Sequence, residues 1–134
     1  MPVTAVIISN GNINDYGFLK KYLDKADFVI CADGGARHLK KLGVMPDVLL
    51  GDFDSIDRND LEYYRKSNVK ILEYPVAKDK TDTELAVEYA AGLGVHRVII
   101  IGALGCRFDH SLCNTFALRK MLDLGIEGVI ADEH

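Results

Sequence analysis

The feature that most constrains the fold of this chain is a regular alternation of apolar, β-branched runs with helix-like stretches. The run VTAVIIS at residues 3–9 is continuously apolar, as expected for a strand buried on both faces of a sheet. Short links between such runs and helices indicate parallel strands joined by right-handed crossovers. We therefore predict an α/β domain, a three-layer α/β/α Rossmann-like fold with a six-stranded, mostly parallel sheet. Its strands are expected at residues 3–9, 27–32, 47–50, 69–74, 98–101 and 129–131.

Helices are expected between these strands. Thr81 and Glu84 form a T-x-x-E capping box at the start of the clearest helix, which Gly92 or Gly94 ends. The other expected helices cover residues 16–23, 36–42, 57–67 and 109–124. Tyr63 and Tyr64 are expected to serve helix packing, and His38 and His96 are expected to be surface or core residues. The last strand ends close to the C-terminus, so residues 1–134 are expected to be one domain of a larger protein.

Composition excludes several classes of protein. The 134 residues are 49% hydrophobic, which suits one domain with a real core, and the net charge of -4 disfavours nonspecific binding to nucleic acid or anionic membranes. No apolar run is long enough to span a bilayer, and the first residues do not resemble a signal peptide. The three cysteines, Cys31, Cys106 and Cys113, form no C-x-x-C pair. We expect reduced thiols in a cytoplasmic protein, with Cys31 buried in a strand.

Polar and glycine residues follow the expected strands, at the edge of the sheet where ligands of such folds bind. The third strand delivers Asp52 and Asp54 in the segment GDFDS. Further aspartates follow other strands, so that six are expected to face one crevice: Asp33, Asp52, Asp54, Asp79, Asp82 and Asp109. The other residues expected at this edge are Asn10, Gly11, Gly34, Gly35, Lys78, Lys80, Gly102, Gly105, Arg107 and His110.

Such a cluster of carboxylates is costly unless a cation joins it. Two like charges 4 Å apart repel by about 4 kcal/mol at an effective dielectric constant near 20. Oxygen donors without cysteine or histidine partners favour Mg²⁺, which keeps waters and shares its shell with substrate phosphates. Glycines at strand ends let backbone amides approach phosphate, and helix N-termini favour anions. The sequence therefore predicts a Mg²⁺–nucleotide site.

Each residue also has a structural interpretation when it is taken alone. Asp52 and Asp54 suit a turn, Asp79 and Asp109 suit helix N-caps, and Asp82 suits the first turn of a helix. The pair Gly34–Gly35 is as consistent with a tight turn as with a phosphate cradle. The sequence has no G-x-x-x-x-G-K-[ST] or G-x-G-x-x-G motif and no protein-kinase signature. The argument for a site is therefore the convergence of these residues at one sheet edge.

Four segments together resemble thiamine pyrophosphokinase, in the order in which that family carries them. They are the segments ADGGA at 32–36, GDFDS at 51–55, KDKTD at 78–82 and GALGCRFDH at 102–110. The resemblance implies transfer of diphosphate from ATP to the hydroxyl of thiamine, giving thiamine diphosphate and AMP with Mg²⁺ as cofactor. It also implies a homodimer with sites between subunits.

The resemblance assigns roles to individual residues. Asp52, Asp54 and Asp82 would hold Mg²⁺, with Asp33 near the metal and the phosphates. Asp109 is also expected to be a catalytic residue. The residues that would order the phosphates, the acceptor or the nucleotide are Asn10, Gly11, Gly34, Lys78, Asp79, Arg107 and Asp109.

The chain departs from the family pattern in two ways. Cys106 replaces the second glycine of a G-G-R motif, and a side chain there could crowd a phosphate. The family's second, β-rich domain, which helps form the thiamine site, is expected to be absent from these residues. Two alternatives stay open. The absence of the second domain favours a Mg²⁺–nucleotide-binding module without turnover, and the D-x-D sequence after an apolar run leaves a phosphatase with a D-x-D nucleophile as the other.

Overall fold

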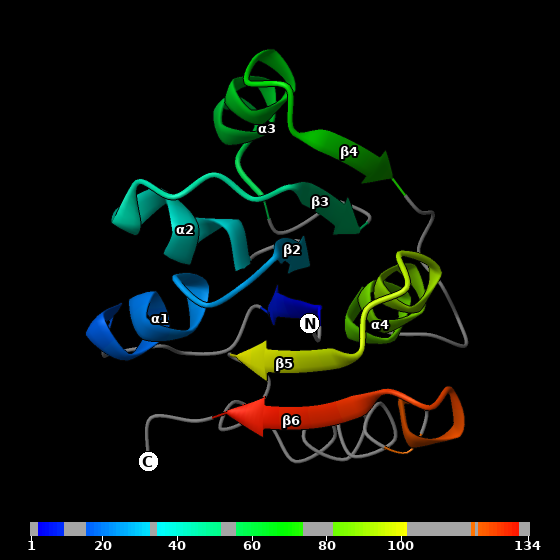
Figure 1. Ribbon diagram of the computed structural model, residues 1–134. Helices are drawn as coiled ribbons and strands as arrows, with labels where there is room; N and C mark the ends of the chain where they lie inside the picture. Colours follow the sequence, from blue (N-terminus) through cyan, green and yellow to red (C-terminus); the bar gives the residue numbers. More distant parts are fainter. Residues whose placement is uncertain are drawn as a thin grey trace, which may run out of the picture.

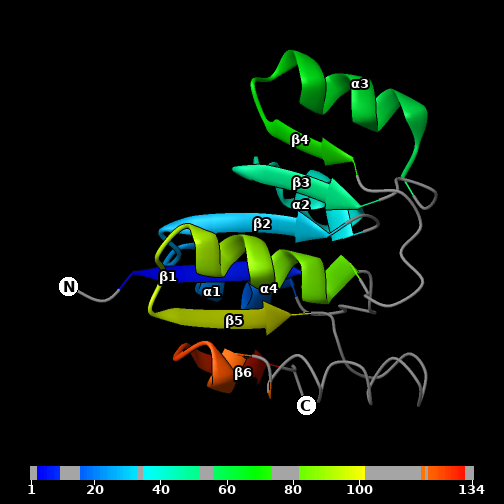
Figure 2. The ribbon, with the colours of Figure 1, turned by 90° about the vertical axis from the view of Figure 1, so that its right-hand side faces the viewer.

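The computed structural model describes residues 3–9, 16–32, 35–51, 56–73, 82–101, 119 and 121–131. Within these ranges the strands form one six-stranded sheet in the order β4-β3-β2-β1-β5-β6, and every strand pair is parallel (Figures 1 and 2). The strands are β1 (Thr4–Ile8), β2 (Phe28–Ala32), β3 (Val48–Gly51), β4 (Lys70–Glu73), β5 (Arg97–Ile101) and β6 (Glu127–Ala131).

Helices cover both faces of this sheet, which confirms the predicted three-layer fold. One face carries α1 (Tyr16–Leu23), α2 (Ala36–Leu42) and α3 (Arg58–Lys66), and α4 (Asp82–Gly92) lies on the other (Figure 1). The side chains of β1 alternate between the two cores: Val6 and Ile8 pack with α1 and α2, whereas Ala5 and Ile7 pack with α4. All four side chains are fully buried, which explains why the sequence run is continuously apolar.

Successive strands are added on one side of β1 first and then on its other side. The chain steps outward from β1 through β2, β3 and β4, then returns over the opposite face to β5 and continues to β6. The carboxyl ends of β1 and β5 therefore flank the topological switch point, where ligands bind in open α/β sheets. Among the described helices, none is long and apolar enough to cross a membrane.

Most expected elements are found within a residue or two of their predicted ends. The bounds of α1 and α2 match the prediction, and α2 ends at Gly43, whose φ of 69° places it in the left-handed region. The strand β6 begins at Glu127, earlier than the predicted residue 129, because Glu127 pairs with Arg97 in register. Of the helix predicted at 109–124, residue 119 and residues 121–123 are described and are helical. The capping box of Thr81 and Glu84 lies outside the described side chains.

Candidate functional site

The residues predicted to bind metal, nucleotide or acceptor lie outside the part of the chain that the structure describes, with one partial exception, and Gly35, expected at the same edge, is described. Asp82 is the first residue of α4, although its side chain is not described. The others outside the described ranges are Asn10, Gly11, Asp33, Gly34, Asp52, Asp54, Lys78, Asp79, Arg107 and Asp109. Their convergence therefore stays a prediction, and the described residues supply the frame from which these segments extend.

That frame is the carboxyl edge of the sheet. The strand β2 ends at Ala32, directly before Asp33, and β3 ends at Gly51, directly before Asp52. The strands β1, β4 and β5 likewise precede the segments with the remaining predicted residues. Because all six strands are parallel, these ends share one edge of the sheet. The described residues contain no group of three or more His, Cys, Asp or Glu side chains that could hold a metal.

Gly51, the last residue of β3, has a backbone conformation that requires glycine. Its φ is 140°, a backbone conformation that residues with a side chain rarely adopt. It still pairs in register with Glu73 of β4 as the last residue of the strand. Its positive φ is consistent with the expectation that a glycine lets the chain turn before the two aspartates of GDFDS, but the residues that would form the turn lie outside the described ranges, so the turn stays a prediction.

Gly35 has a different reason to be glycine from either one that the sequence suggested. A Cβ atom at Gly35 would lie 2.4 Å from the carbonyl oxygen of Ile8 and 3.1 Å from that of Ser9. The start of α2 therefore lies directly against the carboxyl end of β1. The backbone of Gly35 is ordinary, with φ -61°, so close packing and not a tight turn requires the glycine.

Tyr64 joins α3 to the same place. Its hydroxyl donates a hydrogen bond to the carbonyl oxygen of Ala36, the first residue of α2, at 3.3 Å. The side chain is only 1% exposed, and burial raises the pKa of Tyr64 to about 12. We call the contact of Ile8, Gly35, Ala36 and Tyr64 the buried junction.

A second contact joins α1 to α2 near their starts. The hydroxyl of Tyr16 lies 3.0 Å from Nδ1 of His38, and His38 is 2% exposed. His38, expected to be either a surface or a core residue, is therefore a core residue. The sequence assigned no role to this pair. One feature could have suggested the contact: Tyr16 and His38 lie near the starts of helices that follow two neighbouring strands, β1 and β2.

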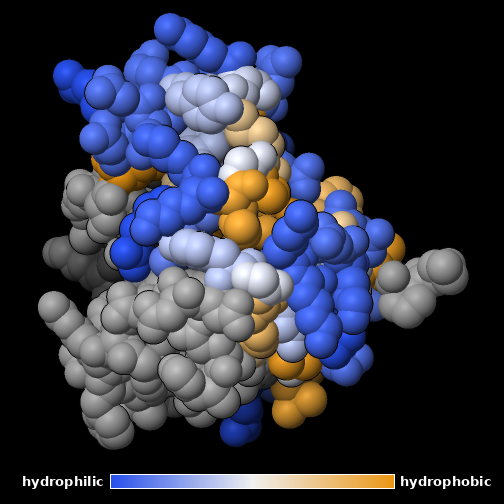
Figure 3. Space-filling view, turned by 90° about the vertical axis from the view of Figure 1, so that its left-hand side faces the viewer, coloured by the Kyte–Doolittle hydropathy of each residue, from blue (hydrophilic) through white to orange (hydrophobic). Residues whose placement is uncertain are grey.

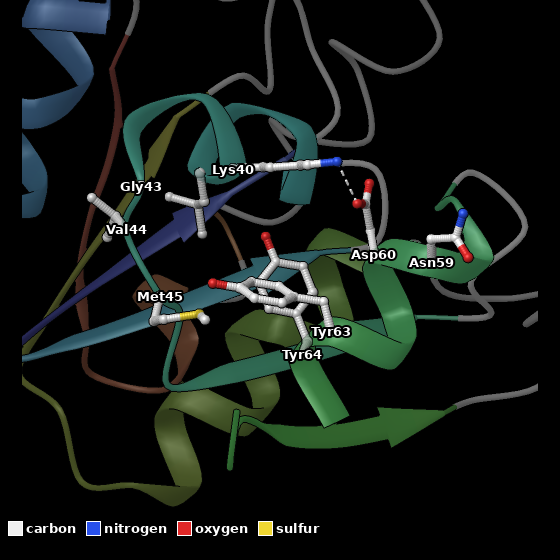
Figure 4. A pocket seen from close by; sticks show the side chains of 9 residues that line it. Lys40, Gly43, Val44, Met45, Asn59, Asp60, Tyr63 and Tyr64 are labelled. Carbon is white, nitrogen blue, oxygen red and sulfur yellow. Dashed lines mark hydrogen bonds and ion pairs between the residues drawn. The ribbon is translucent and has the colours of Figure 1, made fainter. Parts of the chain in front are cut away.

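A pocket of about 390 Å³ lies between α2 and α3 (Figure 4). Figure 4 shows Tyr63 and Tyr64 pointing from α3 toward α2 and the segment after it, with the Lys40–Asp60 ion pair at one side. None of the predicted site residues lines the pocket; its lining is Leu39, Lys40, Gly43, Val44, Met45, Asn59, Asp60, Tyr63 and Tyr64.

Tyr63 and Tyr64 contribute differently to this region. Tyr63 is 55% exposed, so its predicted role in helix packing is wrong, whereas that prediction is confirmed for Tyr64. The hydrogen bond from Lys40 to Asp60, 2.6 Å long, raises the pKa of the lysine.

Figure 3, which faces the side with α1, α2 and α3, shows hydrophobic residues exposed between hydrophilic ones.

The amino edge of the sheet uses polar side chains in a repeated structural arrangement. Asp27 precedes β2, and its carboxylate accepts the backbone N–H of Thr4 at 2.8 Å, while its own N–H donates to the carbonyl of Thr4. Asp47 before β3 makes the same two bonds with Val29, and its carboxylate accepts at 2.7 Å. His96 before β5 does so with Val3, through Nδ1 at 3.0 Å. Each side chain supplies the acceptor that the neighbouring strand lacks at its start.

Comparison with known proteins assigns the family. The family model described as "Thiamin pyrophosphokinase, catalytic domain" matches residues 19–130. Thiamine pyrophosphokinase of Bacillus subtilis is 31% identical over 130 residues, which cover 97% of this chain and 61% of that protein. Its crystal structure superposes with a TM-score of 0.81.

A second solved structure gives the same picture. Thiamin pyrophosphokinase from Geobacillus thermodenitrificans is 27% identical with a TM-score of 0.77, covering 97% of this chain and 60% of that one. The chain thus spans about 61% of the length of the Bacillus subtilis relative. Because the family model covers most of these residues, from within α1 to within β6, the chain belongs to the thiamin pyrophosphokinase family.

Proposed function

We propose that residues 1–134 are the nucleotide-binding catalytic domain of an enzyme that transfers diphosphate from ATP to thiamine. The observation that carries the proposal is the coincidence of two features. The family's acidic segments follow the carboxyl ends of β2 and β3 directly, and the family model matches the same part of the chain. The relatives are longer than this chain, so we further propose that a β-rich domain of the full-length enzyme helps bind thiamine. From the family resemblance and the expected reduced thiols we also propose that the enzyme is a cytoplasmic homodimer.

The proposed metal site uses Asp52, Asp54 and Asp82. Their donors are all carboxylate oxygens, the ligand type that suits Mg²⁺. The positive φ of Gly51 at the end of β3 and the start of α4 at Asp82 are consistent with segments that leave the carboxyl edge of the sheet. Bound Mg²⁺ would neutralise charge on the β- and γ-phosphates of ATP.

The proposed reaction is an in-line displacement at the β-phosphorus of ATP. The thiamine hydroxyl oxygen forms a bond to that phosphorus, the bond to the oxygen shared with the α-phosphate breaks, and AMP leaves. A carboxylate of the site accepts the hydroxyl proton. We propose that Asp33, Asp79, Arg107 and Asp109 order the phosphates and the acceptor, while the nucleotide is also lined by Asn10, Gly11, Gly34 and Lys78. Positioning and electrostatic stabilisation supply most of the rate.

The test replaces one proposed metal ligand and a matched aspartate that has a structural role. Asp54→Asn in the full-length enzyme should lower AMP formation that depends on thiamine and Mg²⁺ by at least about tenfold, or 1.4 kcal/mol. Asp57→Asn is the control, because Asp57 caps α3 by accepting the N–H of Asn59 at 2.7 Å and asparagine caps helices equally well. A smaller loss in Asp54→Asn would exclude Asp54 as a metal ligand.

A second candidate is a binding module that has no turnover by itself. It is favoured by the length of the chain, which covers 61% of its Bacillus subtilis relative. Calorimetric titration of the 134-residue chain with Mg-ATP, beside an assay for AMP release with thiamine, separates the two. Binding without AMP release supports the module, and release supports a complete catalytic unit. The D-x-D phosphatase is not proposed further, because the family match points elsewhere.

A further inference from the structure

We propose that Tyr64 is a positioning residue, whose hydroxyl fixes the helix that follows the segment GDFDS against the helix that follows ADGG. The proposal rests on the proposed function, since it assigns a role in the same Mg²⁺–nucleotide site. It concerns a side chain that no family motif of the sequence contains.

The contact joins two parts of the chain that carry different motifs. Tyr64 belongs to α3, the first helix after Asp52 and Asp54, and Ala36 begins α2, the first helix after Asp33. The hydrogen bond from the Tyr64 hydroxyl to the Ala36 carbonyl spans 28 positions of sequence. A shift of α3 relative to α2 would therefore change the spacing of the two acidic segments.

The buried junction extends this link to a third segment. Next to Ala36, Gly35 packs so closely against β1 that a Cβ atom would be 2.4 Å from the Ile8 carbonyl oxygen. The strand β1 leads to the segment with Asn10 and Gly11. One continuous contact thus connects the bases of three segments with predicted site residues, and Tyr64 holds it from the α3 side.

The hydroxyl, and not only the ring, is needed for this role. The ring is 1% exposed in the core formed by the α1–α3 side of the sheet, where phenylalanine would fill the same space. The Ala36 carbonyl is also positioned to accept the N–H four residues on within α2, so it does not need Tyr64 to be satisfied. The additional bond adds directional restraint to the start of α2.

The experiment compares Tyr64→Phe with two controls in the full-length enzyme. Tyr63→Phe removes the hydroxyl of the adjacent, 55% exposed tyrosine. Lys40→Met removes a different polar link between α2 and α3, the solvent-exposed ion pair with Asp60. The Kd for Mg-ATP, the Mg²⁺ concentration for half-maximal rate, kcat and the unfolding midpoint are measured for each variant.

Tyr64→Phe should raise the Kd for Mg-ATP and the Mg²⁺ requirement by about threefold to tenfold, the range expected for one hydrogen bond. Both controls should stay within twofold of the unmodified enzyme. If the unmodified enzyme binds Mg-ATP and Tyr64→Phe binds it equally well, or if Lys40→Met weakens binding as much, the inference alone is overturned. If the unmodified enzyme does not bind Mg-ATP, the proposed function is overturned and this inference with it.

Discussion

The two edges of the sheet place aspartates in different chemical settings. At the amino edge, Asp27 and Asp47 each accept a backbone N–H of the neighbouring strand, so their carboxylates complete the sheet. At the carboxyl edge, β3 ends at Gly51, directly before Asp52 and Asp54, which we propose to bind metal. The same residue type therefore serves folding at one edge and, by our proposal, chemistry at the other. The difference comes from which end of a parallel strand the residue occupies.

The strongest test of this comparison at the carboxyl edge is Gly35→Ala. The added Cβ would lie 2.4 Å from the Ile8 carbonyl oxygen, and backbone at both sites must move, so we expect a loss of about 3 kcal/mol in the free energy of unfolding. The matched control is Gly92→Ala at the end of α4, where a Cβ meets nothing within 4 Å and a gain of up to about 1 kcal/mol is expected. Urea unfolding measures both, and a Gly35→Ala variant as stable as the control would contradict the close contact.

The next largest effect is expected from Asp47 at the amino edge. Asp47→Ala leaves the N–H of Val29 without its acceptor and should cost about 2 kcal/mol of unfolding free energy, whereas Asp47→Asn keeps an acceptor and should cost less. Both variants should bind Mg-ATP as the unmodified protein does, in calorimetry well below the unfolding temperature. Weakened binding in a variant that remains folded would show that the two edges are not separate in function.

A smaller effect is expected when Tyr64 ionises. Burial raises its pKa from 10.0 to about 12 in the folded protein, so the unfolded chain loses this proton first as pH rises. The contribution of Tyr64 to stability is therefore complete below pH 10 and is lost as pH rises to about 12. Urea midpoints between pH 9 and 12 should fall more steeply for the unmodified protein than for Tyr64→Phe. Parallel curves would mean that the hydroxyl ionises as freely in the folded state as in the unfolded one.

The fold could be predicted from the sequence because its signals are local. Continuous apolar runs identified the strands, and Gly43, with its left-handed backbone, marked the end of α2 where it was expected. The roles of Asp27 and Asp47 could not be predicted, because they depend on a neighbouring strand that is distant in sequence. Tyr63 and Tyr64 were predicted alike, although only Tyr64 has the i+3 spacing from Leu61 that places both on the buried face of α3.

The site could be predicted only as a set of segments at strand ends. The reason for glycine at position 35 is a contact with β1, which no turn or phosphate motif reveals. The buried junction and the Tyr16–His38 contact were likewise missed, since each joins helices that begin after different strands. Motifs identify the reacting groups, whereas the residues that hold them in place are found from packing.

The central claim is that the nucleotide and its metal bind at the carboxyl edge of the sheet, and Mn²⁺ tests it most directly. Mn²⁺ with ATP, added to the isotopically labelled protein, broadens the NMR signals of nearby nuclei. We predict strong broadening for Ile8, Ala32 and Gly51 at the carboxyl ends of β1, β2 and β3, and the least for Asp27, Asp47 and His96 at the opposite edge. Broadening that is strongest at the amino edge, or in the pocket between α2 and α3, would contradict the account.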